Sequence, residues 1–351
     1  MNSQKGGRKR PNPHSQPHQG KWIWACREDA TQDLVEELVR ALGPKGEARA
    51  LEAGLVESKG APIADGKIDL TFARQGFPCL GVFEHHDLQA LEGAIAERVK
   101  TAPAFTVQVW APDSEPGNMR MPLCKRIQER LREAFSERGD LPPFVEHPTQ
   151  GDVELVSVVL REGGEWIWGA QRLAHALSRF PGGRARMRVP GAVSRAARKL
   201  EEAFAWLGVA PAAGERCVDL GAAPGGWSEL LLRKGAWVVA VDPAKLSPSI
   251  QGHPRLVHHM MSAFRYVPDE PPVDWLFCDM AWRPLEVAQL IAKWGRRRWT
   301  RFVIANFKLP MRRKLENVYR IRALVEEGGF RYLRSRQLYH DRDEFTLLAI
   351  A

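Results

Sequence analysis

The sequence predicts an α/β protein whose C-terminal part is a doubly wound parallel sheet with an antiparallel terminal hairpin, preceded by two small α+β modules. Helical and strand patterns alternate from Ser194 onward, as they do in parallel sheets with helices on both faces. A glycine-rich turn, GAAPGG over 221–226, lies between two apolar runs and opens one of these helices. The length of 351 residues exceeds that of an ordinary single core and favours two or three domains.

Composition and charge narrow the class of protein. Hydrophobic residues make up 44% of the chain and charged residues 26%, which is typical of a soluble globular protein. Because no apolar run approaches the roughly 20 residues that span a bilayer, we expect a cytoplasmic protein without a membrane partner. The net charge of +9 favours a polyanionic partner.

The cysteines and the paired histidines form neither a disulfide nor a metal pattern. The five cysteines are scattered, and none is part of a CxxC motif. The histidine pairs at 85–86 and 258–259 lack the i, i+4 spacing of helical zinc ligands. We therefore expect no disulfide framework and no metal.

The N-terminal region predicts a basic tail and a first module. Residues 1–20 contain four basic residues, no acidic residue and no large apolar residue after the first position, so we expect a disordered arm. In the module at 21–80, WIWACR predicts a strand. The next segment predicts a helix with Thr31 as its N-cap and Gly43 at its end. Further short strands are predicted around 68–72.

A second α+β module is predicted at 81–170. AFTVQVWA predicts a strand and CKRIQERLREAFSERG an amphipathic helix. DVELVSVVLREGGEWIWGA predicts two strands joined at 162–164. Residues 171–193 are rich in glycine, proline and arginine and predict a basic linker.

The region 194–351 predicts the doubly wound domain. Its expected helices lie at 195–207, 226–234, 285–294 and 313–327, and its expected strands at 216–220, 236–241, 273–278 and 301–307. Two β-rich runs, FRYLRSRQLYH and EFTLLAIA, then predict an antiparallel hairpin at the edge of the sheet.

The glycine turn and an acidic residue predict a nucleoside-binding site. Glycine lets the backbone approach a ligand, and a helix N-terminus offers unpaired N–H groups. Asp242 follows Gly221 by 21 positions, where a carboxylate accepts hydrogen bonds from ribose hydroxyls. Dinucleotide enzymes and methyl-donor enzymes share this arrangement. The turn departs from the dinucleotide pattern G-x-G-x-x-G, because Ala223 replaces its second glycine and Pro224 stiffens the loop.

The segment LGAAPGGWS resembles the first motif of the FtsJ-type ribose 2′-O-methyltransferases, in which the turn holds S-adenosylmethionine. The resemblance implies a Rossmann-like domain that transfers a methyl group from S-adenosylmethionine to a ribose 2′-hydroxyl. The donor site that it implies consists of Gly221, Ala223, Pro224, Gly225, Gly226, Trp227, Asp242, Ser262 and Asp279.

Four ionisable residues match the Lys-Asp-Lys-Glu tetrad of that family in chain order. Asp279 and Lys308 each follow a predicted core strand, at the edge where ligands of open α/β sheets bind. Lys199 borders the apolar stripe of its helix, and Glu344 opens the last strand. We expect Lys308 to be the general base, which requires burial and cationic neighbours to lower its pKa towards about 7–8. The resemblance implies that Asp279 orients Lys308 and holds the donor's amino group. It also implies that Lys199 and Glu344 place the target ribose.

Longer segments resemble the RlmM type of this family, bacterial enzymes that 2′-O-methylate a cytidine of 23S rRNA. These segments are SRAARKLEEAF, VDLGAAPGGW, CDMAWRP, NFKLPM and RQLYHDRDEFT, and the likeness spans 187–350. Upstream, LTFARQGFP and the 81–170 module resemble the ferredoxin-like and THUMP modules of these enzymes. Two positions depart from the family: Ser262 replaces an aspartate that faces the donor's adenine, and Ala196 replaces a donor-side serine.

Other chemistries remain as alternatives. The strand before Asp279 ends in CDMA rather than in the N/D-P-P-Y/F run of exocyclic-amine methyltransferases. Cys278 points away from the site if Asp279 points into it, which disfavours cytosine carbon-5 chemistry. An NAD-dependent oxidoreductase would share the topology, although Ala223 and Pro224 argue against it. A non-catalytic RNA-binding or assembly factor predicts that Lys308→Ala keeps the full biological effect.

Arginine-rich segments predict an extended RNA surface around the last domain. SRFPGGRARMR, WGRRRWTR and PMRRK each flank predicted site elements. Trp294 and Trp299 border the arginines at 296–298, a mixture suited to phosphate contact and base stacking. We therefore expect RNA, namely 23S rRNA or its precursor, as the partner.

Overall fold

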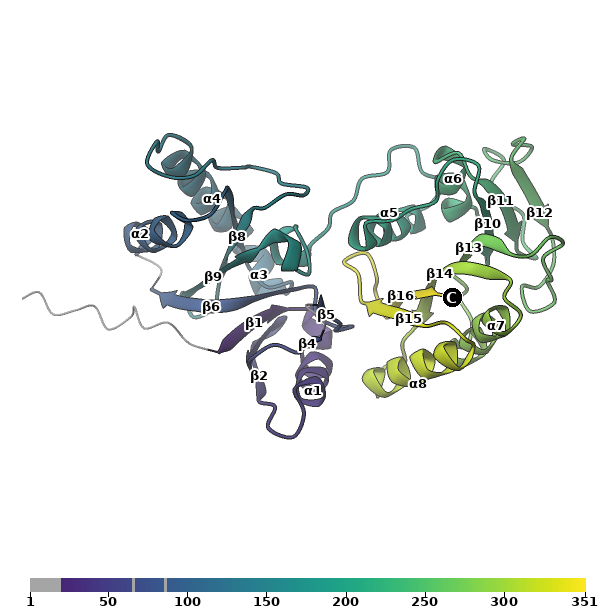
Figure 1. Cartoon of the computed structure of the whole chain (residues 1–351), viewed down its shortest axis with the longest axis horizontal. Coiled ribbons are helices and arrows are strands. Elements are labelled where there is room, and N and C mark those ends of the chain that lie inside the picture. The colour runs from purple at the N-terminus through teal and green to yellow at the C-terminus, as the bar shows by residue number, and fades with distance from the viewer. Residues whose placement is uncertain (1–19, 65–66, 85–86) are drawn as a thin grey trace, which may run out of the picture. The chain divides into compact units, whose positions relative to one another are not determined.

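A computed structural model describes residues 20–64, 67–84 and 87–351 (Figure 1). The predicted N-terminal arm, apart from Gly20, and the first histidine pair lie outside the described residues. The chain forms two compact units. Within the described residues, the N-terminal unit comprises 20–28, 49–61 and 75–182, and the C-terminal unit comprises 29–48, 62–74 and 183–351.

The N-terminal unit is built on a seven-stranded sheet with the order β2-β3-β1-β6-β9-β8-β7. β7 and β8 pair in parallel, whereas the pairs β8–β9, β9–β6, β6–β1 and β1–β3 are antiparallel. The predicted hairpin around 162–164 is confirmed as β8–β9. The strands are β1 (Lys21–Ala25), β2 (Ala48–Glu52), β3 (Leu55–Lys59), β6 (Gln75–Phe83), β7 (Phe105–Trp110), β8 (Glu154–Leu160) and β9 (Trp166–Arg172).

Two amphipathic helices bury their apolar stripes against this sheet. Leu91 and Ile95 of one helix and Leu131 and Phe135 of the other share a core with the strands β7, β8 and β9. The helices of this unit are α2 (Leu88–Val99), α3 (Glu115–Met119) and α4 (Met121–Ser136). The helix α2 lies outside the predicted elements because alanine and glycine dilute its apolar period. Most of β6 does so as well, because two glycines and a proline interrupt it.

The C-terminal unit contains a second seven-stranded sheet, with the order β12-β11-β10-β13-β14-β16-β15. The first five strands are parallel, and β16 runs antiparallel to both of its neighbours. The doubly wound fold is therefore confirmed, with β16 inserted between β14 and the edge strand β15. The strands are β10 (Arg216–Leu220), β11 (Trp237–Val241), β12 (Leu256–His259), β13 (Val273–Cys278), β14 (Thr300–Lys308), β15 (Tyr332–Arg336) and β16 (Glu344–Ile350).

The direction of winding reverses at β10, because β11 lies on one side of it and β13 on the other. In open α/β sheets such a reversal opens a crevice beyond the carboxyl ends of the strands. This carboxyl edge is where β10, β13 and β14 end, and it is where the sequence places the candidate site.

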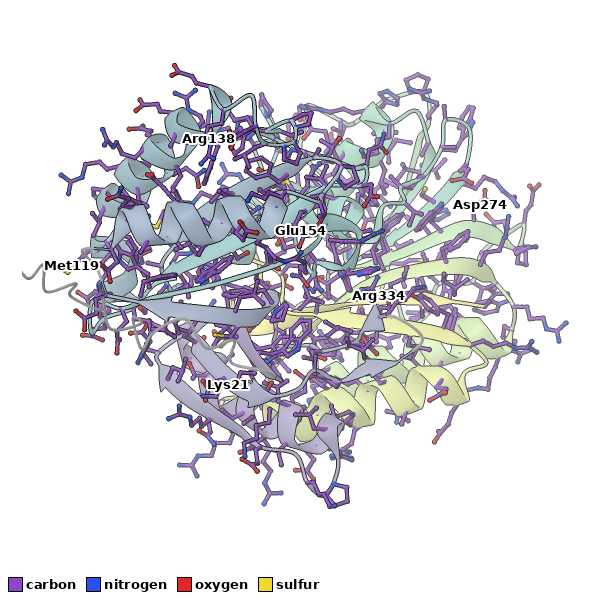
Figure 2. All side chains as sticks on the ribbon, turned by 60° about the vertical axis from the view of Figure 1, so that its left-hand side comes forward. Lys21, Met119, Arg138, Glu154, Asp274 and Arg334 are labelled. Carbon is purple, nitrogen blue, oxygen red and sulfur yellow. The ribbon has the colours of Figure 1, made fainter. Side chains whose placement is uncertain are left out.

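Helices pack on both faces of this sheet (Figure 1). On one face, Phe204 of α5 and Trp227 of α6 each meet the ring of Phe277 edge-on, with centroids 6.2 Å apart. The helices are α5 (Ala196–Leu207), α6 (Gly226–Arg233), α7 (Pro284–Arg296) and α8 (Lys314–Glu327). Asp274 and Arg334, labelled in Figure 2, lie on β13 and β15. Asp274 accepts a hydrogen bond from the Arg216 N–H at 2.9 Å.

The helix α1 (Thr31–Leu42) belongs to the C-terminal unit, although the sequence places it in the module at 21–80. Lys314 of α8 lies 3.5 and 3.6 Å from the carboxylates of Asp29 and Asp33. The Arg40 guanidinium lies over the Tyr319 ring, 4.1 Å from its centroid. Charge pairing and a cation–π contact thus attach this early helix to α8. The short strands β4 (Ile63–Ala64) and β5 (Lys67–Ile68) lie in the same unit.

Two local expectations about this region are wrong and a third is confirmed. Ala30, not Thr31, is the N-cap of α1, and no side chain caps that end. Of the short strands predicted around 68–72, the structure has only Ile68 in a strand, as the last residue of β5. Gly43 does end α1, at a positive φ of 80° that favours glycine. The identification of the N-terminal modules as ferredoxin-like and THUMP-like stays a prediction.

Among the helices that the structure describes, none combines the length and the apolar character needed to cross a bilayer. The described residues also contain no group of three or more His, Cys, Asp or Glu side chains arranged to hold a metal ion. All five cysteines are buried thiols.

Two buried glutamates fix loops of the C-terminal unit in the same way. Glu37 of α1 accepts hydrogen bonds from the backbone N–H groups of Thr71 and Phe72, at 2.7 and 2.9 Å. Glu202 of α5 accepts those of the loop residues at 339–340, at 2.7 and 2.9 Å. Burial raises the pKa of each carboxyl group to about 7, against the hydrogen bonds that favour its charged form. The loop at 339–340 leads into β16, so Glu202 supports the candidate site.

We expect Glu202→Ala to lower the free energy of unfolding by about 2–5 kcal/mol at pH 6, because two backbone donors each lose an acceptor worth roughly 1–3 kcal/mol. Glu201→Ala is the matched control. Glu201 forms only a 3.4 Å ion pair with Lys234, so its loss should cost less than about 1 kcal/mol. Urea unfolding of both variants measures the difference, and equal losses would contradict the proposed anchor.

The same pair of variants also tests the pH dependence. The pKa of Glu202 is raised in the folded state above its value of 4.5 in the unfolded chain, so the folded state binds the proton more tightly. Its contribution to stability is therefore complete below pH 4.5 and is lost as the pH rises through about 7. The stability gap between wild type and Glu202→Ala should narrow over that interval.

Candidate active site

The glycine turn is packed tightly against the protein itself. Gly221 and Gly225 have φ values of 77° and 110°, where other residues are strained. A Cβ atom on Gly221 would lie 2.5 Å from the side chain of Met280, and one on Gly225 would lie 2.3 Å from that of Ile250. The glycines are therefore required by the close approach of neighbouring loops, in addition to any approach of a ligand.

Two residues of the turn attach the start of α5. The buried indole of Trp227 donates a 2.9 Å hydrogen bond to the Ala196 carbonyl. A Cβ atom on Gly226 would lie 2.1 Å from the Ser194 hydroxyl oxygen. The Trp227 side chain thus belongs to the core of the unit, and it holds the helix that carries Lys199. Ser194 is a site residue that sequence reasoning misses, since nothing in the local pattern predicts that it packs on a turn 32 positions later.

A buried carboxyl group fixes the beginning of α6 behind the turn. Asp219 of β10 accepts a hydrogen bond from the Ser228 hydroxyl at 2.7 Å. Burial raises the pKa of Asp219 to about 7, and the hydrogen bond from Ser228 opposes that shift. The N-terminus of α6 is thereby held at the carboxyl edge of the sheet, where its first N–H groups have no partner within the helix.

Asp242 joins the glycine turn to the end of β11. One carboxylate oxygen accepts a 3.1 Å hydrogen bond from the Ala223 N–H, and the other accepts a 2.7 Å bond from the Ala244 N–H. Each oxygen retains a lone pair, because a carboxylate has about four acceptor positions. This half-buried carboxylate and the adjacent N-terminus of α6 have the chemistry to hold a nucleoside that carries an anionic group.

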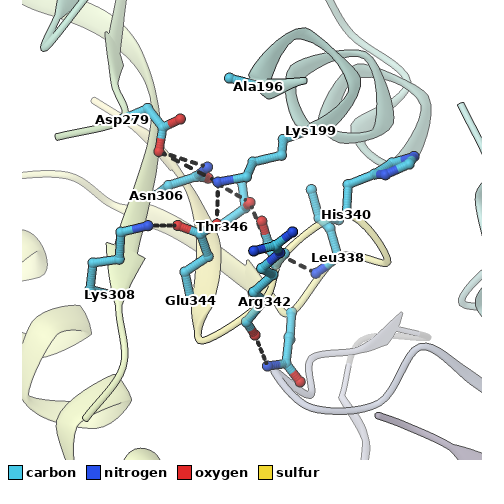
Figure 3. Close-up of polar contacts among 12 residues, drawn as sticks. Ala196, Lys199, Asp279, Asn306, Lys308, Leu338, His340, Arg342, Glu344 and Thr346 are labelled. Carbon is cyan, nitrogen blue, oxygen red and sulfur yellow. Dashed lines mark hydrogen bonds and ion pairs between the residues drawn. The ribbon is translucent and has the colours of Figure 1, made fainter. Parts of the chain in front are cut away.

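The four residues of the predicted tetrad meet at the carboxyl edge (Figure 3). Glu344 pairs with two amines: one oxygen contacts the Lys199 Nζ, and the other lies 2.6 Å from the Lys308 Nζ. Lys199 Nζ also lies 3.8 Å from a carboxylate oxygen of Asp279. Lys308 and Glu344 are direct cross-strand partners of β14 and β16, so the sheet register itself brings them together.

The partner of Lys308 differs from the one expected. Its ion pair is with Glu344, whereas Asp279 pairs with Lys199 and accepts a 3.3 Å hydrogen bond from the Asn306 amide. Asp279 follows directly on β13, and its N–H donates to the Leu220 carbonyl at 3.3 Å, so it lies beside the glycine turn.

Electrostatics distinguish the members of the tetrad. Burial lowers the pKa of Lys199, but the charges of Asp279 and Glu344 outweigh burial and raise its pKa overall. Burial raises the pKa of Asp279 despite the nearby charge of Lys199. Burial also acts to raise the pKa of Glu344, but Lys199 and Lys308 together lower it. Lys199 is thus held protonated and Glu344 ionised.

Three polar residues that sequence reasoning misses support the tetrad. The Thr346 hydroxyl lies 2.7 Å from the Asn306 side-chain oxygen and 3.1 Å from the buried carboxyl group of Asp341. The amide of Asn306 reaches Asp279 in turn. Asn306 and Thr346 face each other across β14 and β16, two positions along from the Lys308–Glu344 pair. The two-residue period of a strand could have indicated them.

Three other positions named in the sequence analysis make fewer contacts with the rest of the site. Ser262 lies exposed three residues after β12, and its carbonyl accepts a 3.0 Å hydrogen bond from the Arg265 N–H. Pro224 is exposed in the turn. The Ala196 carbonyl accepts the hydrogen bond from Trp227, and the Ala196 N–H donates a 3.3 Å bond to the Ser194 hydroxyl.

The predicted stacking role of Trp294 is wrong, because its ring is fully buried and meets Trp299 edge-on. The arginines at 296–298 lie at the C-terminal end of α7, next to the amino end of β14 and away from the carboxyl edge. Arg312 and Arg313, in contrast, follow Lys308 closely and are exposed. Of these two arginine clusters, only the one after β14 flanks the tetrad.

We expect Gly226→Ala to destabilise the C-terminal unit by about 1–3 kcal/mol, since the added methyl group collides with Ser194. In a Ser194→Ala background the nearest obstacle is absent, so part of that loss should be recovered. Thermal unfolding of the four proteins in this cycle measures the coupling. Gly93→Ala, where an added Cβ meets nothing within 4 Å, is the control. The same loss in both backgrounds would disprove the contact.

Comparison with known proteins identifies the family. A family model described as FtsJ-like methyltransferase matches residues 192–293, which include Lys199, the glycine turn and Asp279. The ribosomal RNA large subunit methyltransferase M of Halorhodospira halophila is 36% identical over 345 residues, covering 93% of this chain and 96% of that protein. The protein of the same name from Alkalilimnicola ehrlichii is 34% identical over 364 residues, covering 95% of each chain.

A third relative of that name, from Teredinibacter turnerae, is 41% identical over 182 residues, covering 48% of this chain and 51% of that protein. The resemblance expected from the sequence motifs is thereby confirmed, and the enzyme class is that of a methyltransferase. Because the likeness to the first two relatives extends over nearly the whole of both chains, this chain belongs to the family of ribosomal RNA large subunit methyltransferase M.

Proposed function

We propose that the chain transfers the methyl group of S-adenosylmethionine to a ribose 2′-hydroxyl of ribosomal RNA, at a cytidine of 23S rRNA, with Lys308 as the general base. The observation that carries the proposal is the meeting of two amines and two carboxylates beside the glycine turn. The relatives are named for large-subunit ribosomal RNA, which supports the substrate. A cytoplasmic location is part of the same proposal.

The residues present fit the methyl donor. The Asp242 carboxylate can accept hydrogen bonds from ribose hydroxyls. The free N–H groups in the first turn of α6 can donate hydrogen bonds to the donor's anionic carboxylate. Asp279 directly follows β13 beside the turn, where its carboxylate can accept hydrogen bonds from an ammonium group. When bound, S-adenosylmethionine supplies the methyl group and the positive charge of its sulfonium.

Of the two lysines, Lys308 is better suited to act as the base. Its side chain is 46% exposed and has one ionic partner, so the amine is accessible to an RNA ribose. The Lys199 side chain is 15% exposed and lies between two carboxylates that favour its charged form. Lys199 therefore retains its proton and orients Asp279 and Glu344, whereas Lys308 can accept a proton from the 2′-hydroxyl.

The surroundings expected of Lys308, burial and cationic neighbours, differ from those observed, because its side chain is 46% exposed and its ionic partner is the Glu344 carboxylate. Lys308 must therefore give up a proton before it can act as the base. With both lysines protonated and both carboxylates ionised, the formal charges of the four groups sum to zero. With Lys308 neutral they sum to one negative charge, which favours a neighbouring cation. After the ribose oxygen gives up its proton, the Glu344 carboxylate, 2.6 Å away, stabilises the Lys308 ammonium group that results.

We expect Lys308→Arg to reduce the rate of methyl transfer by at least about 100-fold, because a guanidinium keeps the pairing with Glu344 but cannot give up its proton. Lys234→Arg is the matched control, because Lys234 is also ion-paired, 3.4 Å from Glu201, and lies away from the carboxyl edge. The assay follows labelled methyl groups from S-adenosylmethionine into unmodified 23S rRNA in a single turnover.

The product of that assay also tests the position of the methyl group. A 2′-O-methyl ribose lacks the hydroxyl that cleaves RNA in alkali, so the modified linkage should resist alkaline hydrolysis. Undiminished transfer by Lys308→Arg would exclude Lys308 as the base. No transfer by the wild type to any rRNA would favour the non-catalytic alternative.

We expect Asp242→Asn to weaken binding of S-adenosylmethionine by about 10-fold or more, since hydrogen bonds to a charged group contribute roughly 1.5–3 kcal/mol. Asp274→Asn, on the opposite edge of the same sheet, should leave the dissociation constant unchanged. Calorimetric titration measures both variants, with NAD as a second ligand. Binding of NAD in place of S-adenosylmethionine by the wild type would support the oxidoreductase alternative.

A further inference from the structure

An exposed tryptophan closely follows one of the proposed catalytic residues, Asp279, in the sequence. Trp282 follows Asp279 by three positions, in the loop between β13 and α7, and 51% of its surface is exposed. Its backbone N–H donates to the Met280 carbonyl at 2.9 Å, so this residue is part of a tight turn at the carboxyl edge. A large aromatic ring in solvent here has no role in the core.

The Trp282 ring is held in a fixed position despite its exposure. Its indole N–H donates a 2.6 Å hydrogen bond to the Glu286 carboxylate, which also accepts a 3.1 Å bond from Arg283. The ring of Phe264 packs against it, with centroids 5.8 Å apart and an interplanar angle of 56°. An aromatic ring that is already ordered loses little conformational entropy when a ligand stacks on it.

Basic groups continue from this ring along α7. A shallow hollow of about 490 Å³ is lined by Phe264, Glu286, Gln289, Leu290, Lys293 and Arg296. The polar and basic members recur at helical spacing on one face of α7. An aromatic platform beside positive side chains is the combination that binds single-stranded nucleic acid, in which bases stack and phosphates pair with cations.

We propose that the exposed face of Trp282 stacks on a base of the RNA strand that carries the target ribose. The stacked base fixes the strand at the carboxyl edge, so that the ribose hydroxyl reaches Lys308. Trp282 is therefore an RNA-positioning residue, and Glu286 positions its ring. This inference rests on the proposed function for its substrate class, and it adds the contact that orients the strand.

The test compares Trp282→Ala with Trp237→Ala in the full-length chain. Trp237 is equally exposed, at 51%, but it begins β11 and so lies at the opposite edge of the same sheet. The readouts are the dissociation constant for labelled, unmodified 23S rRNA, the single-turnover rate at saturating RNA, and the dissociation constant for S-adenosylmethionine.

We expect Trp282→Ala to weaken RNA binding by about 10- to 100-fold, the range found when a stacked aromatic is removed. Trp282→Phe should recover most of this loss, because stacking needs an aromatic face and not the indole N–H. Trp237→Ala should leave RNA binding unchanged. All three variants should bind S-adenosylmethionine like the wild type and keep its thermal stability.

Unchanged RNA binding by Trp282→Ala would overturn the inference while leaving the proposed function intact. Weakened binding of S-adenosylmethionine alone would overturn it as well, since the ring would then contact the donor. Failure of the proposed function is separate, because it appears as absent methyl transfer by the wild type. RNA affinity is measured in a binding assay that does not require methyl transfer. The result for Trp282 can therefore be interpreted even if the wild type transfers no methyl group.

Discussion

The site depends on one carboxylate shared by two amines. Glu344 is almost completely buried, and it holds Lys199 from α5 and Lys308 from β14 at the same point. A buried carboxylate of this kind is stable only when cations compensate its charge, and the two lysines provide that compensation. The antiparallel pairing of β14 and β16 fixes the arrangement, because it places Lys308 directly opposite Glu344. Insertion of β16 beside β14 is thus what makes the tetrad possible.

The glycine turn packs against the segments that carry the tetrad. Its glycines allow Met280, Ile250 and Ser194 to approach the backbone, so that the loop after β13 and the start of α5 both pack on it. Trp227 then fixes α5 through the Ala196 carbonyl. The turn that would hold the donor therefore also sets the position of the helix carrying Lys199. Donor site and tetrad are connected through backbone and core contacts.

A segment far upstream in the chain supports the loop that leads into β16. The Arg74 guanidinium donates to the carbonyls of Gln337 and Leu338, at 3.3 and 2.8 Å. The Gln337 N–H donates to the Thr71 carbonyl at 2.7 Å, and the Thr71 hydroxyl lies 2.8 Å from that of Ser335. Together with Glu202, these bonds hold the backbone of the loop that leads into β16 and Glu344.

The alternation of helices and strands, the glycine turn with Asp242, and the strand-end positions of Asp279 and Lys308 are all predictable from the sequence. Each of these follows from local periodicity or from motif spacing, which neighbouring residues encode. Three outcomes came from the folded chain alone: Lys308 pairs with Glu344 and not with Asp279, Trp227 and Trp294 are buried, and α1 joins the C-terminal unit. Those outcomes depend on strand order, register and packing between distant segments, and no local pattern specifies them.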